Sequence, residues 1–587
     1  MRKGIPVSPG VVVGTAYCID EIYVAPTSER LGAGEAAAEK VRYEAARHRV
    51  AAELRALQEK VRRQVGPEEA AVFAMQESIL RDVALTDRVG RWILDERMSA
   101  PAALHRLLQE YTAIFEKTTD EYLRERVNDL RDVVVRLSAH LSDVTQADHR
   151  VLPHPLIIVA QELLPSQAVM LGHVEVEGIV TQAGSQTSHA AIIARSRGIP
   201  AVCGVPHILR HVKTGDPIIV DGRNGTVIVD PDAETAAAYR KLEREFLLLR
   251  DELAGNRDHP AVTRDGIPLQ LLANVNGVDD AETAQAMGAS GVGLFRTEYL
   301  YLTHADIPDE NEQFETYCRI IDASPNHSVT IRTLDIGGDK TVPYLGSRHK
   351  EANPFMGWRS IRLSFEHPEF FMAQVRAILR AGHHAEAKGG AVRILFPMIT
   401  TIEEVHRVRQ VVRRCRRQLD KEGLPYANLP IGMMLEVPAA AVAIDTMLPW
   451  VDFVSIGSND LVQYLMAADR DNPKVSHLCQ PLAPAVLRIL RQAIEACLSA
   501  GVSVTLCGEM AGQPSAFVLL LGMGLRSFSM SPAFVPSIKE LATHVSIPQS
   551  RAILEHALRL KTTGHVRRYL AERLHEIAPS LDMLESR

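Results

Sequence analysis

The sequence of 587 residues has few cysteines and no excess of basic residues. Its seven cysteines are scattered, odd in number and free of any Cys-X-X-Cys pair. This pattern indicates a reducing compartment and argues against a disulfide framework or a zinc cluster. The formal net charge of −7 provides no basic surface for nucleic acid and is too small to indicate disorder.

No segment of the sequence predicts membrane insertion. Proline and glycine interrupt the first ten residues before any apolar run develops, unlike in a signal peptide. The longest apolar stretch, around residues 517–525, contains glycines and is far too short to span a bilayer. We therefore expect a cytoplasmic protein.

The length predicts about three or four domains. Residues 1–20 have a strand-rich pattern, and five further strand patterns return between residues 155 and 230. From about residue 30 to 147 apolar residues recur at helical spacing, for example at Val50, Leu54, Leu57 and Val61. We predict one α/β domain from residues 1–20 plus 148–232, with residues 21–147 inserted into it as a helical bundle.

The second half of the chain has a different pattern. Residues 233–258 have the composition of a charged linker helix, and residues 259–587 alternate strand-like runs with helical patterns. Eight such runs predict a TIM (β/α)8 barrel, whose chemistry should lie at the C-terminal strand ends. The runs cover residues 269–275, 291–295, 329–334, 393–398, 431–435, 453–456, 502–506 and 527–530. The expected fold class is therefore multidomain α/β.

Arginines stand at or after several of the predicted barrel strands. The guanidinium group offers a fixed bidentate fork to phosphate and to carboxylate. A single arginine at a strand end is more often part of a surface ion pair. Several arginines at one barrel mouth favour a substrate that carries both anionic groups. The four candidates are Arg296, Arg332, Arg359 and Arg470.

Two carboxylates follow neighbouring predicted strands, Glu436 after the fifth and Asp460 after the sixth, with Asn459 beside Asp460. Two protein carboxylates with substrate oxygens and water suit Mg²⁺, and the same ligands suit Mn²⁺. The alternatives are two solvated carboxylates or partners for the arginines. Cys507, after the seventh strand, is either an inert buried residue or a proton donor above the barrel.

One histidine follows two N-cap-type hydroxyl residues in Thr187-Ser188-His189, just before an apolar helical pattern. At a helix N-terminus, free backbone N–H groups and the helix dipole favour an anion. The same field disfavours protonation, so the imidazole of His189 stays neutral and nucleophilic. The alternative is a histidine with only a capping role.

These segments together resemble the phosphoenolpyruvate-utilising enzymes, in particular the Enzyme I family of the bacterial phosphotransferase system. The resemblance covers essentially the whole chain. The resemblance implies that His189 accepts the phosphoryl group of phosphoenolpyruvate and passes it to a histidine of an HPr-type carrier. It also implies a role for each strand-end residue: Arg296, Arg332, Arg359, Asn459 and Arg470 as substrate ligands, Glu436 and Asp460 as Mg²⁺ ligands, and Cys507 as the acid that protonates the enolate. The motifs that carry the resemblance are residues 8–10, 187–189, 293–298, 332–340, 353–359, 455–464 and 507–512.

The resemblance further implies HPr binding by the helical insertion and a homodimer formed through the barrel domain. His189 and the barrel belong to different predicted domains, so we expect the α/β domain to swing over the barrel about the helix at 233–255. One motif departs from the family. Its usual Gly-Gly-Arg-Thr-Ser-His reads Gly-Ser-Gln-Thr-Ser-His here, so Ser185 and Gln186 replace a glycine and a positive charge.

Three alternatives remain at this point. A phosphoenolpyruvate synthase or pyruvate-phosphate dikinase would carry a large ATP-binding domain ahead of the histidine domain, whereas only about 150 mostly helical residues precede it here. A nitrogen-type regulatory paralogue usually carries an N-terminal sensory domain, which this sequence lacks, yet the altered histidine loop is compatible with it. A catalytically inactive scaffold is disfavoured by the intact barrel residues.

Overall fold

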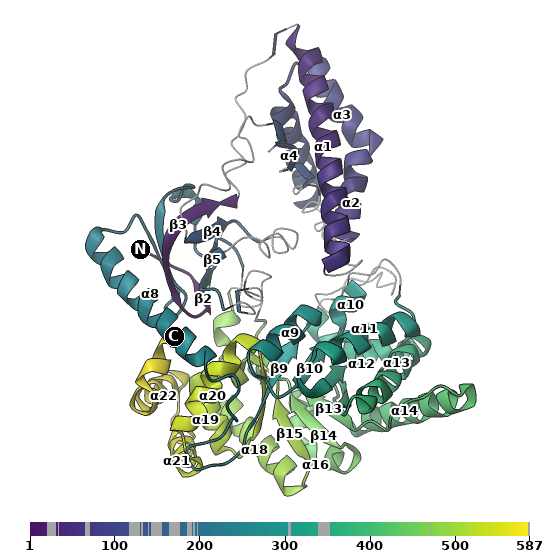
Figure 1. The fold of residues 1–587 in the computed structure, drawn as a ribbon, viewed down its shortest axis with the longest axis vertical. Coiled ribbons are helices and arrows are strands. Elements are labelled where there is room, and N and C mark those ends of the chain that lie inside the picture. The colour runs from purple at the N-terminus through teal and green to yellow at the C-terminus, as the bar shows by residue number, and fades with distance from the viewer. Residues whose placement is uncertain are drawn as a thin grey trace.

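The computed structural model contains two bodies with sheets and one helical body (Figure 1). It describes residues 1–19, 31–32, 34–64, 71–116, 130, 133–134, 136–138, 140–141, 155–163, 176–184, 191, 194–195, 198–302, 307–337, 351, 353–470, 472 and 474–584. The predicted boundaries at residues 20 and 147 lie outside the described residues, and the division at residues 232 and 258 remains a prediction.

The first body is built on an eight-stranded mixed sheet in the order β1-β8-β7-β3-β4-β5-β6-β2. The central pairs β3–β4, β4–β5 and β5–β6 are parallel, whereas β3–β7, β7–β8, β1–β8 and β2–β6 are antiparallel. Because β3 pairs directly with β4, the helices between them are an insertion into one sheet. The strands are β1 (Arg2–Lys3), β2 (Ile5–Ser8), β3 (Val11–Cys18), β4 (Leu156–Ala160), β5 (Val176–Thr181), β6 (Ala201–Cys203), β7 (Pro217–Asp221) and β8 (Thr226–Val229).

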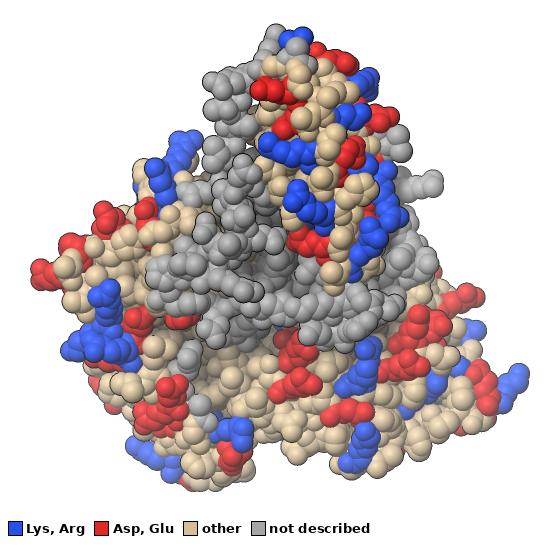
Figure 2. Space-filling view, turned by 45° about the horizontal axis from the view of Figure 1, so that its top comes forward, with Lys and Arg blue, Asp and Glu red and all other residues tan. Residues whose placement is uncertain are grey.

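The inserted body consists of helices that stand away from the sheet in Figure 1. The predicted apolar stripe is buried at Val50 and Leu54, which belong to one cluster with Val133 and Leu137. The side chains of Leu57 and Val61 lie outside the described part of the chain. Acidic and basic residues are interspersed on the face of this body seen in Figure 2. Its helices are α1 (Glu35–Gln64), α2 (Ala71–Arg81), α3 (Val83–Leu94) and α4 (Ala100–Glu116).

Helix α8 (Ala233–Ala254) connects the sheet body to the barrel. The Asp232 side chain caps its first turn by accepting a hydrogen bond from the Thr235 amide. Along the helix, the Glu243 carboxylate accepts a hydrogen bond of 2.8 Å from the amide of Val13 on β3. Just after its end, the backbone oxygen of Arg257 accepts a 2.8 Å hydrogen bond from Lys539 of the barrel body. The helix is thus fixed to both bodies.

The second body is a closed barrel of eight parallel strands, which confirms the predicted barrel. The strand order is β9 to β16 around the ring, and β16 closes on β9. Each strand is mostly buried, as expected for a parallel barrel enclosed by helices. The strands are β9 (Gln270–Val275), β10 (Val292–Arg296), β11 (Ser328–Arg332), β12 (Ala391–Phe396), β13 (Ile431–Leu435), β14 (Phe453–Ile456), β15 (Ser503–Leu506) and β16 (Ser527–Met530).

Helices surround the barrel on its outside (Figure 1). The longest are α13 and α14, which pack on each other, and α13 also packs on β12 of the ring. None of the helices in the described ranges combines the length and apolar character needed to cross a membrane. The helices of this body are α9 (Val278–Ala286), α10 (Glu298–Leu302), α11 (Glu310–Ala323), α12 (Ser360–Glu366), α13 (Pro368–Ala387), α14 (Ile402–Glu422), α15 (Pro438–Val442), α16 (Ile444–Met447), α17 (Ser458–Met466), α18 (Pro484–Ser499), α19 (Pro514–Gly522), α20 (Val535–His544), α21 (Ile547–Ala557) and α22 (Thr563–Ile577).

Candidate active site at the barrel mouth

Most of the predicted site residues of the barrel lie at or just after the C-terminal ends of its strands. Arg296 and Arg332 are the last residues of β10 and β11. Glu436 and Cys507 directly follow β13 and β15, and Asp460 lies in the first turn of α17, just after β14. Since all eight strands are parallel, these ends meet at one mouth.

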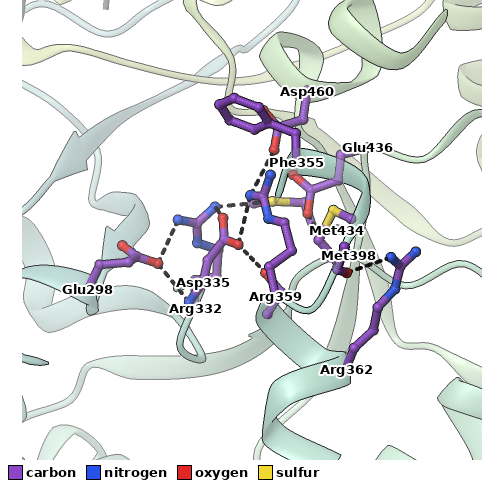
Figure 3. A network of polar contacts seen from close by, with 12 residues as sticks. Glu298, Arg332, Asp335, Phe355, Arg359, Arg362, Met398, Met434, Glu436 and Asp460 are labelled. Carbon is purple, nitrogen blue, oxygen red and sulfur yellow. Dashed lines mark hydrogen bonds and ion pairs between the residues drawn. The ribbon is translucent and has the colours of Figure 1, made fainter. Parts of the chain in front are cut away.

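A continuous chain of ion pairs crosses the mouth (Figure 3). Arg332 contacts Glu298 at 2.7 Å and Asp335 at 3.0 Å. Asp335 contacts Arg359 at 2.9 Å, and the same nitrogen of Arg359 contacts Asp460 at 3.1 Å. Opposite charges therefore alternate along residues from four different elements. The sequence predicted the two arginines and Asp460, and the structure brings them together.

Burial makes this network costly to break. Arg332, Asp335, Arg359 and Asp460 are each less than 10% exposed. Burial alone would raise the pKa of Asp335, but the Arg359 and Arg332 guanidiniums and the Ser360 hydroxyl lower it well below its usual range. Removing one partner of such a buried pair leaves an uncompensated charge and costs about 3–5 kcal/mol.

The backbone around Arg359 is shaped to bring it into the mouth. Gly337 has a φ of +119° and forms an isolated antiparallel bridge with Arg359. A Cβ atom at Gly337 would lie 2.4 Å from the Cβ of Arg359, so only glycine allows this approach. The next residue, Ser360, has a left-handed φ of +54° and donates its hydroxyl hydrogen bond to Asp335. Strained residues of this kind concentrate at functional sites.

Arg296 differs from the other arginines because, among the described residues, it has no hydrogen-bond or ion-pair partner. Burial and the neighbouring Arg332 charge lower its pKa, while Glu298, Cys507 and Glu509 act in the opposite direction. An anion placed beside Arg296 would stabilise its charged guanidinium against both the burial and the repulsion from Arg332. The arrangement leaves this arginine ready for an anionic ligand.

Glu436 is the most deeply buried carboxylate of the mouth and makes no ion pair among the described residues. Its Oε1 accepts a 2.6 Å hydrogen bond from the amide of Met398, a residue with a φ of +55°. Burial, together with the charges of Asp460 and Asp335, raises the pKa of Glu436 to about 8. Two buried carboxylates that repel one another fit a site for a cation.

No group of three or more His, Cys, Asp or Glu side chains in the described part of the chain is arranged to hold a metal. A metal at Glu436 and Asp460 would thus take its other ligands from substrate oxygens or water, as Mg²⁺ commonly does. The alternative interpretation was that these carboxylates pair with the arginines. Asp460 does so as well, because Arg470 contacts its second oxygen at 2.7 Å. Glu436 and Asp460 therefore fit a Mg²⁺ site.

Cys507 is buried at the base of the mouth and its thiol donates a 3.5 Å hydrogen bond to the backbone oxygen of Ile456. Burial raises the pKa of this thiol, and Glu436 acts in the same direction against Arg332 and Arg296. The thiol therefore stays protonated at neutral pH. A protonated thiol beside the arginines can serve as an acid.

Asn459 lies next to Asp460 in the first turn of α17, and its Oδ1 accepts a 3.1 Å hydrogen bond from the amide of Glu509. The Asn459 side chain thus ties the loop after β14 to the loop after β15. His189 and its loop, residues 185–190, lie outside the described residues, as do residues 338–340 of the third loop.

Sequence reasoning did not assign three polar residues of the mouth. Glu298 and Asp335 stand inside two motifs named above, residues 293–298 and 332–340. The sequence signal available for them was an acidic residue soon after a predicted strand, in the same motif as an arginine. Tyr464 was not assigned either. Its hydroxyl accepts a 3.1 Å hydrogen bond from Arg359 and donates one of 2.6 Å to the backbone oxygen of Phe355. No local pattern would have found this contact.

Comparison with known proteins assigns a family to this architecture. Three family models match successive parts of the chain. They are described as the N-terminal domain of PEP-utilising enzymes at residues 3–126, the mobile domain at 152–225 and the PEP-binding domain at 250–547. The last match spans the barrel and every mouth residue described above. The barrel and its mouth therefore define a PEP-utilising enzyme.

Curated relatives extend over nearly the whole length. The phosphoenolpyruvate-protein phosphotransferases of Bacillus sp. (strain S) and Geobacillus stearothermophilus are 38% and 39% identical over 564 residues, covering 96% of this chain and of each relative. That of Haemophilus influenzae is 36% identical over 577 residues, covering 98% of this chain and 99% of the relative. The chain belongs to the phosphoenolpyruvate-protein phosphotransferase family. These full-length matches favour this assignment over a dikinase or a synthase.

Proposed function

We propose that the protein transfers the phosphoryl group of phosphoenolpyruvate to His189 and then to a histidine of an HPr-type carrier protein. The observation that carries the proposal is the barrel mouth, where arginines from strand ends and loops lie among four buried carboxylates and a buried thiol. The length and order of the family matches support the same function.

The substrate has two anionic groups, and the arginines supply matching donors. In the proposal, Arg296 binds one of these groups directly, since it has no internal partner to release among the described residues. Arg332, Arg359 and Arg470 exchange part of their contacts with Asp335 and Asp460 for contacts with the substrate. This exchange keeps each charge compensated, so binding does not pay the full cost of uncovering a buried ion. Asn459 completes the set of ligands.

Glu436 and Asp460 are the residues that would hold Mg²⁺, or Mn²⁺ in its place. When bound, such an ion neutralises charge on the transferring phosphoryl group. The Met398 amide orients Glu436, and Arg470 orients Asp460. Both carboxylates are therefore fixed before substrate arrives.

In the transfer itself, the bond from phosphorus to the enol oxygen breaks and a bond from phosphorus to a ring nitrogen of His189 forms. The departing enolate takes a proton on its terminal carbon from the thiol of Cys507, which yields pyruvate. The resulting thiolate then recovers its proton from solvent. The raised pKa of Cys507 suits a group that must begin the cycle as an acid.

The remaining parts of the proposal concern partners and movement. We assign HPr binding to the helical insertion at 21–147, and a homodimer contact to the barrel domain at 259–587. The domain at 1–20 plus 148–232 brings His189 over the mouth and away again, with the helix at 233–258 as linker. The location proposed for this reaction is the cytoplasm.

The test is labelling with phosphoenolpyruvate that carries a radioactive phosphoryl group, in the presence of Mg²⁺. The protein should acquire an acid-labile label, and His189→Ala should acquire none while keeping the circular dichroism and unfolding temperature of the parent. Addition of an HPr-type protein should move the label to that protein. Persistent acid-labile labelling of His189→Ala, or labelling that requires ATP, would rule the proposal out.

A further inference from the structure

A single ion pair in the described ranges joins the sheet body to the barrel mouth. Nη1 of Arg195 lies 2.8 Å from Oε2 of Glu509. The backbone oxygen of Arg195 also accepts a hydrogen bond of 3.5 Å from the hydroxyl of Ser531, which follows β16. The two bodies are therefore in polar contact at the loops after the last two barrel strands.

Glu509 belongs to the loop that carries the candidate acid. It stands two residues after Cys507, and its amide is held by Asn459. Gly508 allows this close packing, because a Cβ atom there would lie 1.8 Å from the hydroxyl oxygen of Ser458. The position of Glu509 is thus fixed by residues of the reacting site.

Arg195 belongs to the segment that carries the candidate phosphoryl acceptor. It stands six residues after His189 in the sequence. Six residues span at most about 20 Å, even when fully extended. An ion pair between Arg195 and Glu509 therefore confines the region that His189 can reach to the surroundings of the barrel mouth.

We propose that Arg195 and Glu509 form a latch that holds the sheet body over the barrel during phosphoryl transfer. The proposal rests on the function proposed above and names two positioning residues for it, neither of which bonds the substrate. The Glu509 side chain is 39% exposed and that of Arg195 is 13% exposed. Water thus reaches one side of the pair, which lets the latch open again for transfer to the carrier.

The latch is also linked to occupancy of the mouth. The negative charge of Glu509 lies close enough to Arg296 to oppose the lowering of its pKa. Asn459, which holds the Glu509 amide, is itself a proposed substrate ligand. Substrate bound to Arg296 and Asn459 would leave Glu509 with Arg195 as its cationic partner. Closure would then follow substrate binding.

The test compares Arg195→Gln, Glu509→Gln and the double charge exchange Arg195→Glu/Glu509→Arg. In rapid-quench labelling from phosphoenolpyruvate, we expect each single variant to lower the maximum rate about fivefold, as expected for losing a partly exposed pair. The phosphoenolpyruvate concentration for half-maximal rate should change much less. The charge exchange should recover most of the rate. Small-angle scattering with phosphoenolpyruvate and Mg²⁺ should show single variants more extended than the parent.

The matched control is Arg491→Gln, which removes another arginine that pairs with glutamates on the barrel, Glu495 and Glu555. This variant should label like the parent. Single variants that label at the parental rate, or a charge exchange that rescues nothing, would overturn the latch. A parent protein that takes no label from phosphoenolpyruvate would instead refute the proposed function, so the two failures are distinguishable.

Discussion

The barrel body and the sheet body differ in how many ionisable side chains they bury. Among the described residues, the barrel body buries seven charged side chains, and six of them lie at its mouth. The sheet body buries one, Asp221, whose carboxylate accepts hydrogen bonds from the amides of Arg223 and Asn224 in a turn. The charged residues buried at the mouth are Glu298, Arg332, Asp335, Arg359, Glu436 and Asp460.

Physical cost explains what this difference means. A buried ion pair is seldom more stabilising than apolar residues of the same volume, so the six ionisable side chains buried at the mouth are not needed for folding. Lys539, the seventh buried charge, has a structural use, because it donates to the backbone oxygens of Arg257 and Gly288. The mouth charges are best explained by a ligand. The sheet body, in contrast, buries one charge among its described residues, and in the proposed function it carries one reactive side chain, His189.

The largest expected effect comes from breaking the network at Arg332→Ala. This change leaves Glu298 and Asp335 short of a partner in a buried site, which should lower the free energy of unfolding by about 3 kcal/mol. Labelling from phosphoenolpyruvate should slow at least about a thousandfold. Chemical denaturation and rapid-quench labelling measure the two effects.

The control for Arg332→Ala is Asp221→Asn, which alters the one buried charge of the sheet body. This change should lower the free energy of unfolding by only about 1 kcal/mol, because the amide oxygen of asparagine still accepts hydrogen bonds from the turn. Its labelling rate should match that of the parent. If both variants slowed labelling equally, the contrast between the two bodies would have no functional meaning.

Glu436→Gln should change metal affinity and the stability of the fold in opposite directions. The raised pKa of about 8 means that folding takes up a proton at neutral pH, so this carboxyl weakens the metal-free fold increasingly as pH rises from about 4.5 to about 8. Glutamine should therefore raise the free energy of unfolding by about 1–2 kcal/mol at pH 7. Affinity for Mn²⁺ should fall about a hundredfold, as measured by calorimetry.

A decrease in stability of the metal-free Glu436→Gln protein would contradict this account. So would unchanged Mn²⁺ affinity, because the carboxylate would then have no role as a metal ligand. Glu422→Gln is a suitable control, since Glu422 is an exposed carboxylate of α14 that pairs with Arg376 and lies outside the mouth.

Cys507→Ala tests the proton donor. We expect the steady-state rate to fall about a hundredfold, the lower end for loss of a general acid, because water can still protonate the released enolate. Proton donation from the thiol delivers the proton to one face of the enolate. Phosphoenolpyruvate that is stereospecifically tritiated at its terminal carbon should therefore give, in heavy water, pyruvate with a methyl group (H, D, T) of one preferred configuration, and the variant should lose this preference. Retained stereochemistry would assign the acid role to another residue.

The same comparison shows where sequence reasoning succeeds. The eight barrel strands are buried apolar runs, so their positions could be read within a few residues. The predicted run 329–334 ends at Arg332 in the structure, which puts Thr333 and Leu334 on the loop. Reactive residues follow strands directly, and parallel strands bring their ends together. For this reason Arg296, Arg332, Glu436 and Cys507 could be named from local context.

Contacts between distant elements could not be predicted in this way. Arg359 meets Asp460 across 101 positions, and Arg195 meets Glu509 across 314. Their separation carries no periodic signal, because each pair depends on how loops and whole bodies pack. The left-handed backbone at Ser360 and Met398 was equally hidden, since neither residue type indicates a positive φ.

The smallest expected effect concerns the sheet body and its histidine loop. Gln186 stands where the family usually has arginine, three residues before His189. An arginine there would add a positive charge near the incoming phosphoryl group, so Gln186→Arg should raise the labelling rate severalfold, by about 1 kcal/mol at most. Gln186→Lys is the matched control, because it adds the charge without the bidentate fork and should give a smaller increase. An unchanged rate in both variants would mean that the barrel arginines already supply all the positive charge the transfer requires. The sheet body would then contribute no charge to the reaction.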